Sequence, residues 1–200
     1  MADLFKDQFD QFRQRFLRRF VDQGDGSHAE LVVTSPIASE SHLGAVGGHS
    51  APLELVLSLD NNAYGSGDVL AATQALANAV RVSGGTALLD MVQVLDEDDQ
   101  GGALDILFFR SNVDIGAENG AFDITDAEAR ELLGWINVAA ADYTDFGGWR
   151  LATIKRGDTG FKASVLKPTT GTSLYVAVIS RDTKTYSAAG VRLILHVFQD

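Results

Sequence analysis

This chain of 200 residues contains no cysteine, so histidines and clustered carboxylates are the first side chains to consider for metal binding or catalysis. Without cysteine it forms neither a disulfide nor a thiolate metal site, and it has no cysteine nucleophile. No two of its histidines have the spacing that places two metal ligands on one face of a helix or strand. We therefore expect no metal site and no bound cofactor. The histidines are His28, His42, His49 and His196.

A run of four acidic residues, Asp96 to Asp99, offers oxygen ligands for calcium. The spacing of an EF-hand loop is absent, and glycines follow the acids as they do in a turn between two strands. A solvated turn is therefore the better interpretation of this run. The glycines of Ser83-Gly84-Gly85 likewise favour a hairpin turn over a phosphate-binding loop, because the segment joins two expected strands and opens no helix.

The sequence patterns of several common enzymes are also absent. There is no P-loop, no G-x-S-x-G nucleophile elbow and no H-E-x-x-H zinc motif. No pattern assigns a catalytic residue, so we expect a protein that is not an enzyme. Aromatic side chains could instead form a sugar-binding platform, although most strand aromatics in a β-sandwich face the core. The aromatic candidates are Trp135, Tyr143, Trp149 and Tyr175.

The elements that must position such side chains begin with a helix at the N-terminus. Five phenylalanines recur at intervals of three or four residues, which places their rings on one stripe of a helix over residues 3–22. Acidic residues lie in its first half and arginines in its second, as the helix dipole favours. The sequence Gly24-Asp25-Gly26 then supplies a stop signal.

The phenylalanine stripe has two interpretations. It packs on the protein's own β-rich body, as apolar helix faces commonly do, or it contacts a partner. Aromatic and arginine side chains are enriched in protein interfaces, so we assign residues 1–23 to a docking helix. The candidate contact residues are Phe5, Phe9, Phe12, Phe16, Phe20, Arg13, Arg15, Arg18 and Arg19.

Charge separates this segment from the rest of the chain. Residues 1–20 hold five basic and three acidic side chains, a net charge of +2, so the other 180 residues carry −13 and the whole chain −11. An acidic body argues against nucleic-acid binding, because phosphate contacts need clustered Lys and Arg. Interleaved aspartates argue against a helix that lies on a membrane. No stretch resembles a membrane span or a signal peptide, so we expect synthesis and assembly in the cytoplasm.

Residues 24–52, rich in Gly, Ser, Ala and His, are expected to form an extended arm or linker. From residue 53 onward, short apolar or alternating runs are separated by turn signals at intervals of roughly 8 to 15 residues. One short helix interrupts them, because Thr125 and Glu128 form a capping box at the start of DAEARELL. Short strands with almost no helix between them predict an antiparallel β-sandwich over 53–200. The strand candidates are LELVLSL, DVLAA, ALANAVRV, TALLDMVQVL, ALDILFF, WINVAAA, WRLATI, FKASVL, TSLYVAVIS and VRLILHVF.

Several segments of this body resemble virion structural proteins of tailed bacteriophages. They are AYGSGDVL, SGGTALLDMVQVLDEDDQGGALDILFFRSN, NGAFDITDAEARELLGWI followed by ADYTDF, and the closing GTSLYVAVISRDTKTYSAAGVRLILHVFQD. The resemblance covers about residues 53–200 and rests on strand-and-turn signatures in the same order. It implies a jelly roll that serves as a decoration, or cement, protein on the outer surface of the phage head and bridges subunits of the major capsid protein.

A clamp of this kind opposes the separation of shell subunits, because its contacts reinforce one another. Such clamps usually form small symmetric oligomers, so the resemblance implies a homotrimer or homodimer, made in the host cytoplasm. The N-terminal segment is then expected to contact the shell. Three alternatives stay open: a head-fibre base, neck or tail structural protein, a glycan-binding module for host attachment, and a hydrolase or isomerase whose pocket would be lined with carboxylates or histidines.

Overall fold

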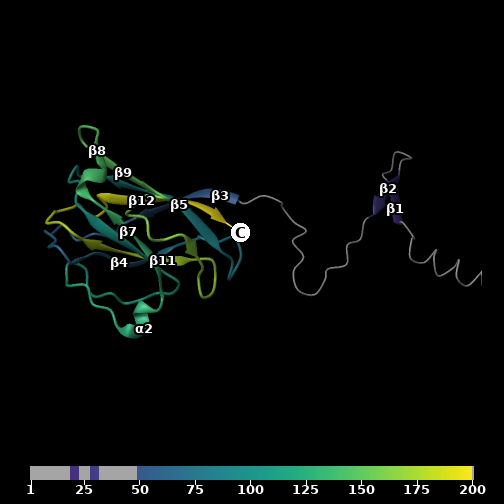
Figure 1. Cartoon of the computed structure of the whole chain (residues 1–200), viewed down its shortest axis with the longest axis horizontal. Coiled ribbons are helices and arrows are strands. Elements are labelled where there is room, and N and C mark those ends of the chain that lie inside the picture. The colour runs from purple at the N-terminus through teal and green to yellow at the C-terminus, as the bar shows by residue number, and fades with distance from the viewer. Residues whose placement is uncertain (1–18, 23–27, 32–48, 200) are drawn as a thin grey trace, which may run out of the picture. The chain divides into compact units, whose positions relative to one another are not determined.

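The computed structural model of the chain describes residues 19–22, 28–31 and 49–199. The chain divides into two compact units, Met1–Val46 and Gly47–Asp200 (Figure 1). In the first unit, strands β1 (Arg19–Asp22) and β2 (His28–Leu31) pair in antiparallel fashion, with Arg19 opposite Leu31.

Strand β1 shows that the prediction of a helix over 3–22 is wrong for its last four residues. Phe20 and Val21 are residue types that favour strands, and the Gly-Asp-Gly sequence that stops a helix also suits the turn of a hairpin. Pairing with β2 places Arg19 and Phe20 in a strand, and it makes a strand of part of the predicted arm as well. The other candidate contact residues, Phe5, Phe9, Phe12, Phe16, Arg13, Arg15 and Arg18, lie outside the described residues.

The second unit is mainly β and consists of two antiparallel sheets, as predicted. The first sheet has the strand order β3-β12-β5-β9-β8, with β10 also paired to β5, and the second sheet has the order β4-β11-β6-β7. The helices described in this unit are single turns, α2 (Asp126–Ala129) and the 3₁₀ helix η1 (Ala140–Asp142). The strands are β3 (His49–Val56), β4 (Val69–Leu76), β5 (Ala87–Asp96), β6 (Leu104–Phe109), β7 (Leu132–Val138), β8 (Tyr143–Asp145), β9 (Arg150–Lys155), β10 (Val165–Leu166), β11 (Leu174–Ser180) and β12 (Val191–Gln199).

Side chains from the inner faces of both sheets form one buried cluster, the main core. Strand β5 sends Ala87, Leu89, Val92 and Val94 into this core, while Gln93 and Leu95 alternate with them on the opposite face. Phe108 of β6, in the second sheet, is fully buried in the same cluster. A core shared by two antiparallel sheets is consistent with the predicted β-sandwich.

A second buried cluster lies on the outer face of the second sheet. Phe109 follows Phe108 in β6, points the opposite way and is also fully buried. It packs with Val113 and Ile115 from residues 110–131, the segment that joins β6 to β7 and contains α2. The covering segment thus buries the outer face of the second sheet around Phe109, while Trp135 of β7 remains 40% exposed.

The capping box predicted in the covering segment is confirmed. The N–H of Glu128 donates to the Thr125 hydroxyl at 3.3 Å, and the Thr125 N–H donates to the Glu128 carboxylate at 2.9 Å. The helix that it starts ends at Ala129, so the predicted eight-residue helix is too long. Leu132 already pairs with Phe109 in the second sheet, and this pairing overrides the helix propensity of the sequence. In the described part of the chain no helix is long and apolar enough to cross a membrane.

Two strand boundaries and the type of one turn also differ from the prediction. Strand β3 begins at His49, four residues before the expected body, because its pairing with β12 continues that far. The expected strand over 75–82 is a strand only at its start, since Asn78 has a φ of +55° in the turn that follows β4. Ser83-Gly84-Gly85 does form a turn, but it connects β4 of the second sheet to β5 of the first and is therefore not a hairpin.

Candidate binding surface on the first sheet

No segment among residues 49–199 covers the outer face of the first sheet, in contrast to that of the second sheet around Phe109. Strand alternation places Leu95 of β5, Leu151 of β9 and Ile194 of β12 on this face, where each is only partly buried. Val56 of β3, 38% exposed, and Phe198 of β12, 45% exposed, continue the apolar surface. Large apolar side chains that gather on one accessible face mark a candidate interaction surface.

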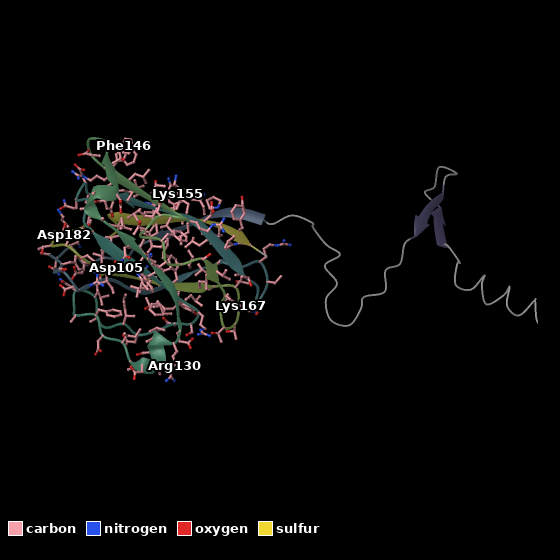
Figure 2. The ribbon with its side chains drawn as sticks, in the orientation of Figure 1. Asp105, Arg130, Phe146, Lys155, Lys167 and Asp182 are labelled. Atoms are coloured by element: carbon pink, nitrogen blue, oxygen red, sulfur yellow. The ribbon has the colours of Figure 1, made fainter. Side chains whose placement is uncertain are left out.

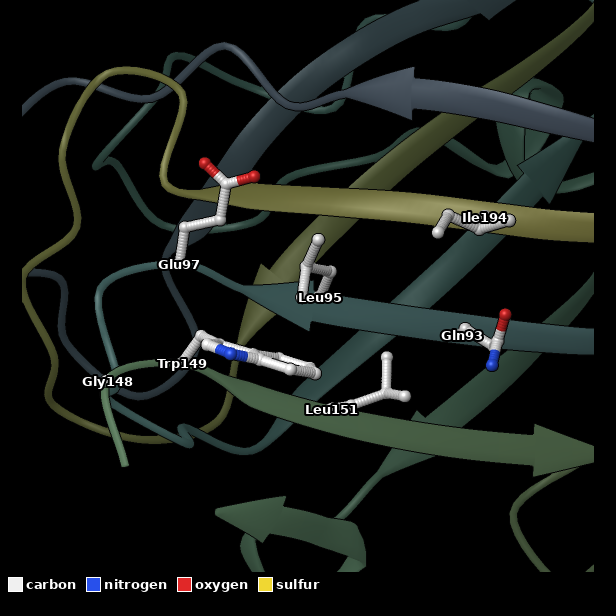
Figure 3. A pocket seen from close by; sticks show the side chains of 7 residues that line it. All are labelled: Gln93, Leu95, Glu97, Gly148, Trp149, Leu151 and Ile194. Atoms are coloured by element: carbon white, nitrogen blue, oxygen red, sulfur yellow. The ribbon is translucent and has the colours of Figure 1, made fainter. Parts of the chain in front are cut away.

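A groove of about 570 Å³ crosses this face (Figure 3). Trp149 lies on one side of this groove and Ile194 on the other, while Gln93 and Glu97 lie toward its two ends. We call it the Trp149 groove; its remaining lining residues are Leu95, Gly148 and Leu151. A smaller hollow of about 170 Å³ on the same sheet is lined by Ser50, Pro52, Asp90, Met91, His196, Val197 and Phe198.

The hairpin between β8 and β9 holds Trp149 in place. Its ring stacks on that of Phe146, with centroids 4.4 Å apart and planes 13° from parallel. The Phe146 N–H donates to the Trp149 carbonyl at 3.0 Å, and the Gly147 N–H donates to the Asp145 carboxylate at 2.7 Å. Gly147 has a φ of +79°, which glycine adopts without strain. Figure 2 shows Phe146 at the tip of the hairpin, where it is 53% exposed.

Arg150 connects this hairpin to the turn that follows β5. Its Nε donates to Asp99 Oδ1 at 2.7 Å, and its Nη2 donates to Asp145 Oδ2 at 3.1 Å. The hydrogen bond that Arg150 donates to Asp99 is the main reason that the pKa of Arg150 is raised above its ordinary value. Because Trp149 precedes Arg150 directly, the position of the indole depends on this turn.

Residues 96–101, the acidic turn, are organised by a buried carboxylate. Asp96 is 1% exposed and accepts hydrogen bonds from the N–H groups of Gly101 at 2.6 Å and Asp98 at 3.0 Å. Burial raises the pKa of Asp96, although these two N–H groups oppose the shift. The prediction of a solvated turn is therefore wrong for Asp96. Among the described residues, no group of three or more His, Cys, Asp or Glu side chains could hold a metal ion.

One arginine cluster stands at an end of the Trp149 groove, and a second belongs to the neighbouring hairpin. Arg192 Nη2 lies 3.4 Å from Glu97 Oε1, and Arg192 Nη1 donates to Glu54. Arg150 likewise has two carboxylates as partners, those of Asp99 and Asp145. Each arginine thus faces two acids, so each cluster carries one excess negative charge at neutral pH.

The four aromatic residues considered for a sugar-binding platform are not brought together. Trp135 lies in β7 of the second sheet, while Trp149 belongs to the hairpin of the first. Tyr143 packs against the main core, and Tyr175 packs against the cluster beneath the covering segment. Trp149 instead has Phe146 as its partner, a residue that was not among the aromatic candidates chosen from the sequence.

The histidines are likewise dispersed among the elements. His196 Nε2 lies 3.2 Å from Gln93 Oε1 on the open face of the first sheet. His28 falls in β2 and His49 in β3, while His42 lies outside the described residues. The groove residues missed by sequence reasoning are the outward-facing ones of β5, β9 and β12. The alternation of apolar and polar residues in these strands predicted the strands themselves, but it did not predict which face of the sheet no described segment covers.

Comparison with known proteins adds no family to this description. No protein-family model matches the chain, and no curated protein matches it. Among solved structures, the C-terminal domain of EclA, a sugar-binding protein, is 14% identical, with 82% of this chain and 86% of that one covered and a TM-score of 0.25. A mutant VP2 protein of infectious bursal disease virus, in derived T=1 particles, is 13% identical, with 86% of this chain and 42% of that one covered and a TM-score of 0.22. TM-scores this low carry no argument about function.

Proposed function

We propose that the chain is a non-enzymatic structural protein of a tailed-bacteriophage virion, a decoration protein that binds the outer surface of the head and stabilises contacts between major capsid protein subunits. The observation that carries the proposal is the difference between the two outer faces: residues 110–131 cover much of one, while no described segment covers the apolar outer face of the first sheet. An open apolar face with a polar rim fits contact with another protein. The resemblance over residues 53–200 supports a virion component as that protein.

The strand order supports a jelly roll. Strands β3, β12, β5 and β9 lie side by side in one sheet and β4, β11, β6 and β7 in the other. The chain therefore crosses between sheets at β3 to β4, β4 to β5, β5 to β6, β7 to β8, β10 to β11 and β11 to β12. Eight strands in two sheets with such crossings form the double Greek key of jelly rolls. Viral capsid domains and lectins share this architecture, so the open face and not the fold supports the choice of partner.

The partners follow from the same proposal. The major capsid protein is the binding partner, and the decoration protein acts as a homotrimer or homodimer, because symmetric repetition lets each weak contact add to the others. The acidic chain, with a net charge of −11, does not bind nucleic acid or membranes. It is made in the host cytoplasm and joins the outside of the head.

The number of copies per particle tests the proposal. Quantitative mass spectrometry of purified virions should give a ratio to the major capsid protein near one to one or a simple fraction of it, because a decoration protein occupies every equivalent position on the shell. A few to a few dozen copies would instead indicate a head-fibre base, neck or tail protein. Absence from particles would refute a virion role.

Replacing Phe9, Phe12 and Phe16 together with serine is expected to abolish binding to heads while the second unit remains folded. These residues lie outside the described residues, and the prediction rests on the spacing of the phenylalanines and on the enrichment of aromatic side chains in interfaces. Sedimentation of the variant with undecorated heads measures binding, and a melting curve checks the fold. Unchanged cosedimentation would mean that the segment does not dock the protein.

A second candidate function is glycan binding, which one observation favours. Trp149 and Phe146 form a stacked, exposed aromatic pair, and such planar apolar surfaces can contact a sugar ring. A glycan array probed with the full chain tests this candidate. Binding that Trp149→Ala abolishes would favour attachment to the host surface over decoration of the head.

A further inference from the structure

We infer that the Trp149 groove is the docking site for a segment of a partner protein that presents aromatic or aliphatic side chains with an arginine or lysine beside them. The inference rests on the proposed function in one respect, namely that the partner is a protein of the virion. It adds the position of the contact and the chemistry of the segment that fits there.

The lining of the groove calls for apolar side chains. Leu95, Leu151 and Ile194 supply aliphatic surface from three neighbouring strands, and Trp149 supplies an aromatic wall (Figure 3). Burial of these side chains by a partner removes apolar area from water, which is the main driving force of association. A volume of about 570 Å³ accommodates several side chains, so a segment rather than a single residue fills it.

Trp149 has the properties of a preorganised anchor. The stack on Phe146, the hydrogen bond that closes the turn and the Arg150 ion pairs hold its indole before any partner arrives. A side chain that is already ordered loses little conformational entropy on binding. Tryptophan is also among the residues that most often dominate the energy of an interface.

The acidic end of the groove specifies the charge of the partner. The Arg192 cluster reaches this end through Glu97, which lines the groove. Because this cluster keeps one excess negative charge, a basic residue in the segment is attracted and an acidic one is repelled. Charge complementarity therefore favours a segment that combines apolar and basic residues.

A sugar fits the groove less well than such a segment. The polar groups that could bind hydroxyls already have partners, since Gln93 Oε1 lies 3.2 Å from His196 Nε2 and Glu97 is paired with Arg192. The remaining lining side chains, those of Leu95, Leu151, Ile194 and Trp149, are apolar or offer at most the indole N–H. Sugar recognition needs polar groups placed to receive the hydroxyls, so a sugar becomes one outcome of the test.

Titration with short peptides tests the inference on the full chain. The probes are an acetylated pentapeptide with two phenylalanines around a central arginine, the same peptide with a central glutamate, and the disaccharide maltose. In a Trp135→Phe background, the fluorescence of Trp149 alone reports binding. We expect the arginine peptide to shift this fluorescence and to bind about fivefold or more tightly than the glutamate peptide, with a smaller difference at high salt.

Two matched alanine variants locate the site by calorimetry. Trp149→Ala should weaken binding of the arginine peptide by about tenfold or more, as expected for an interface anchor. Trp135→Ala is the control, because Trp135 is equally exposed at 40% but lies on the second sheet, and this variant should bind as the wild type does. Equal affinity for the two peptides, no binding of either, tighter binding of maltose, or an unaffected Trp149→Ala variant would each overturn the inference.

Particles distinguish this inference from the proposed function. If wild-type protein is present in virions and Trp149→Ala is incorporated at the same copy number, the groove is not the contact and the structural role stands. If the wild-type protein is absent from virions, the structural role fails, and the peptide titration still decides what the groove binds.

Discussion

Phe109→Ala is expected to lower the free energy of unfolding by about 3–5 kcal/mol and to loosen the covering segment on the second sheet. Phe109 is fully buried and belongs to the same cluster as Val113 and Ile115. Its truncation removes apolar contacts and leaves a cavity between the sheet and residues 110–131. Hydrogen bonds also hold the segment, among them Asn119 N–H to the Val69 carbonyl at 2.8 Å and Thr73 Oγ1 to the Val113 carbonyl at 2.6 Å, so local opening and not complete detachment is expected.

Phe108→Ala is the matched control for this prediction. Phe108 is the preceding residue, is equally buried and faces the main core, so its truncation should cost a similar amount in urea denaturation without loosening the covering segment. Limited trypsin digestion under native conditions separates the two variants, because Arg110 and Arg130 lie within the segment. Early cleavage at these arginines is expected for Phe109→Ala alone. The same cleavage pattern in both variants would show that the outer cluster does not hold the segment.

Asp96→Ala is expected to lower the free energy of unfolding by about 3 kcal/mol, because it leaves the N–H groups of Gly101 and Asp98 without their acceptor. Gly101 is itself buried, so water does not readily replace the carboxylate. Disorder in the acidic turn also frees Asp99, the partner of Arg150. The variant should therefore show altered Trp149 fluorescence as well as a lower melting temperature, and unchanged values of both would refute a structural role for the turn.

The raised pKa of Asp96 predicts the sign of a pH effect. A carboxyl group whose pKa is higher in the folded than in the unfolded state stabilises the fold below its ordinary pKa of 3.8, and this contribution is lost as pH rises through the raised value. The free energy of unfolding of wild type minus that of Asp96→Asn should therefore fall as pH increases above about 4. This difference removes the pH dependence that comes from other carboxyl groups, such as Glu128, whose lowered pKa is the same in both variants. A difference that rises over this range would contradict the assignment.

Local signals in the sequence predicted the elements that depend on neighbouring residues. The capping box at Thr125 was correct because its two hydrogen bonds join residues three apart. The helix after it was predicted too long because Leu132 pairs with Phe109, a contact across 23 positions that no local pattern contains. Arg19 and Phe20 show the same limit, since their pairing with β2 replaced the expected helical turn with a strand.

Local sequence signals could not predict the candidate site. Trp149 was named from the sequence, but its stack on Phe146 requires the turn at Gly147, and the groove requires β5, β9 and β12 to lie side by side. The acidic run was read as solvated because composition alone does not show that Asp96 turns inward to accept two N–H groups.

By itself, the sequence determined that the second unit is mainly β, because alternation and turn residues act over a few positions and specify strands wherever the chain goes. It also determined the acidic charge of that unit, which is a matter of counting. Only the tertiary structure decided which apolar face is covered and which is open. That choice depends on residues 110–131 folding back onto the second sheet and on no described segment doing so for the first, and burial of this kind joins residues that are distant in the chain.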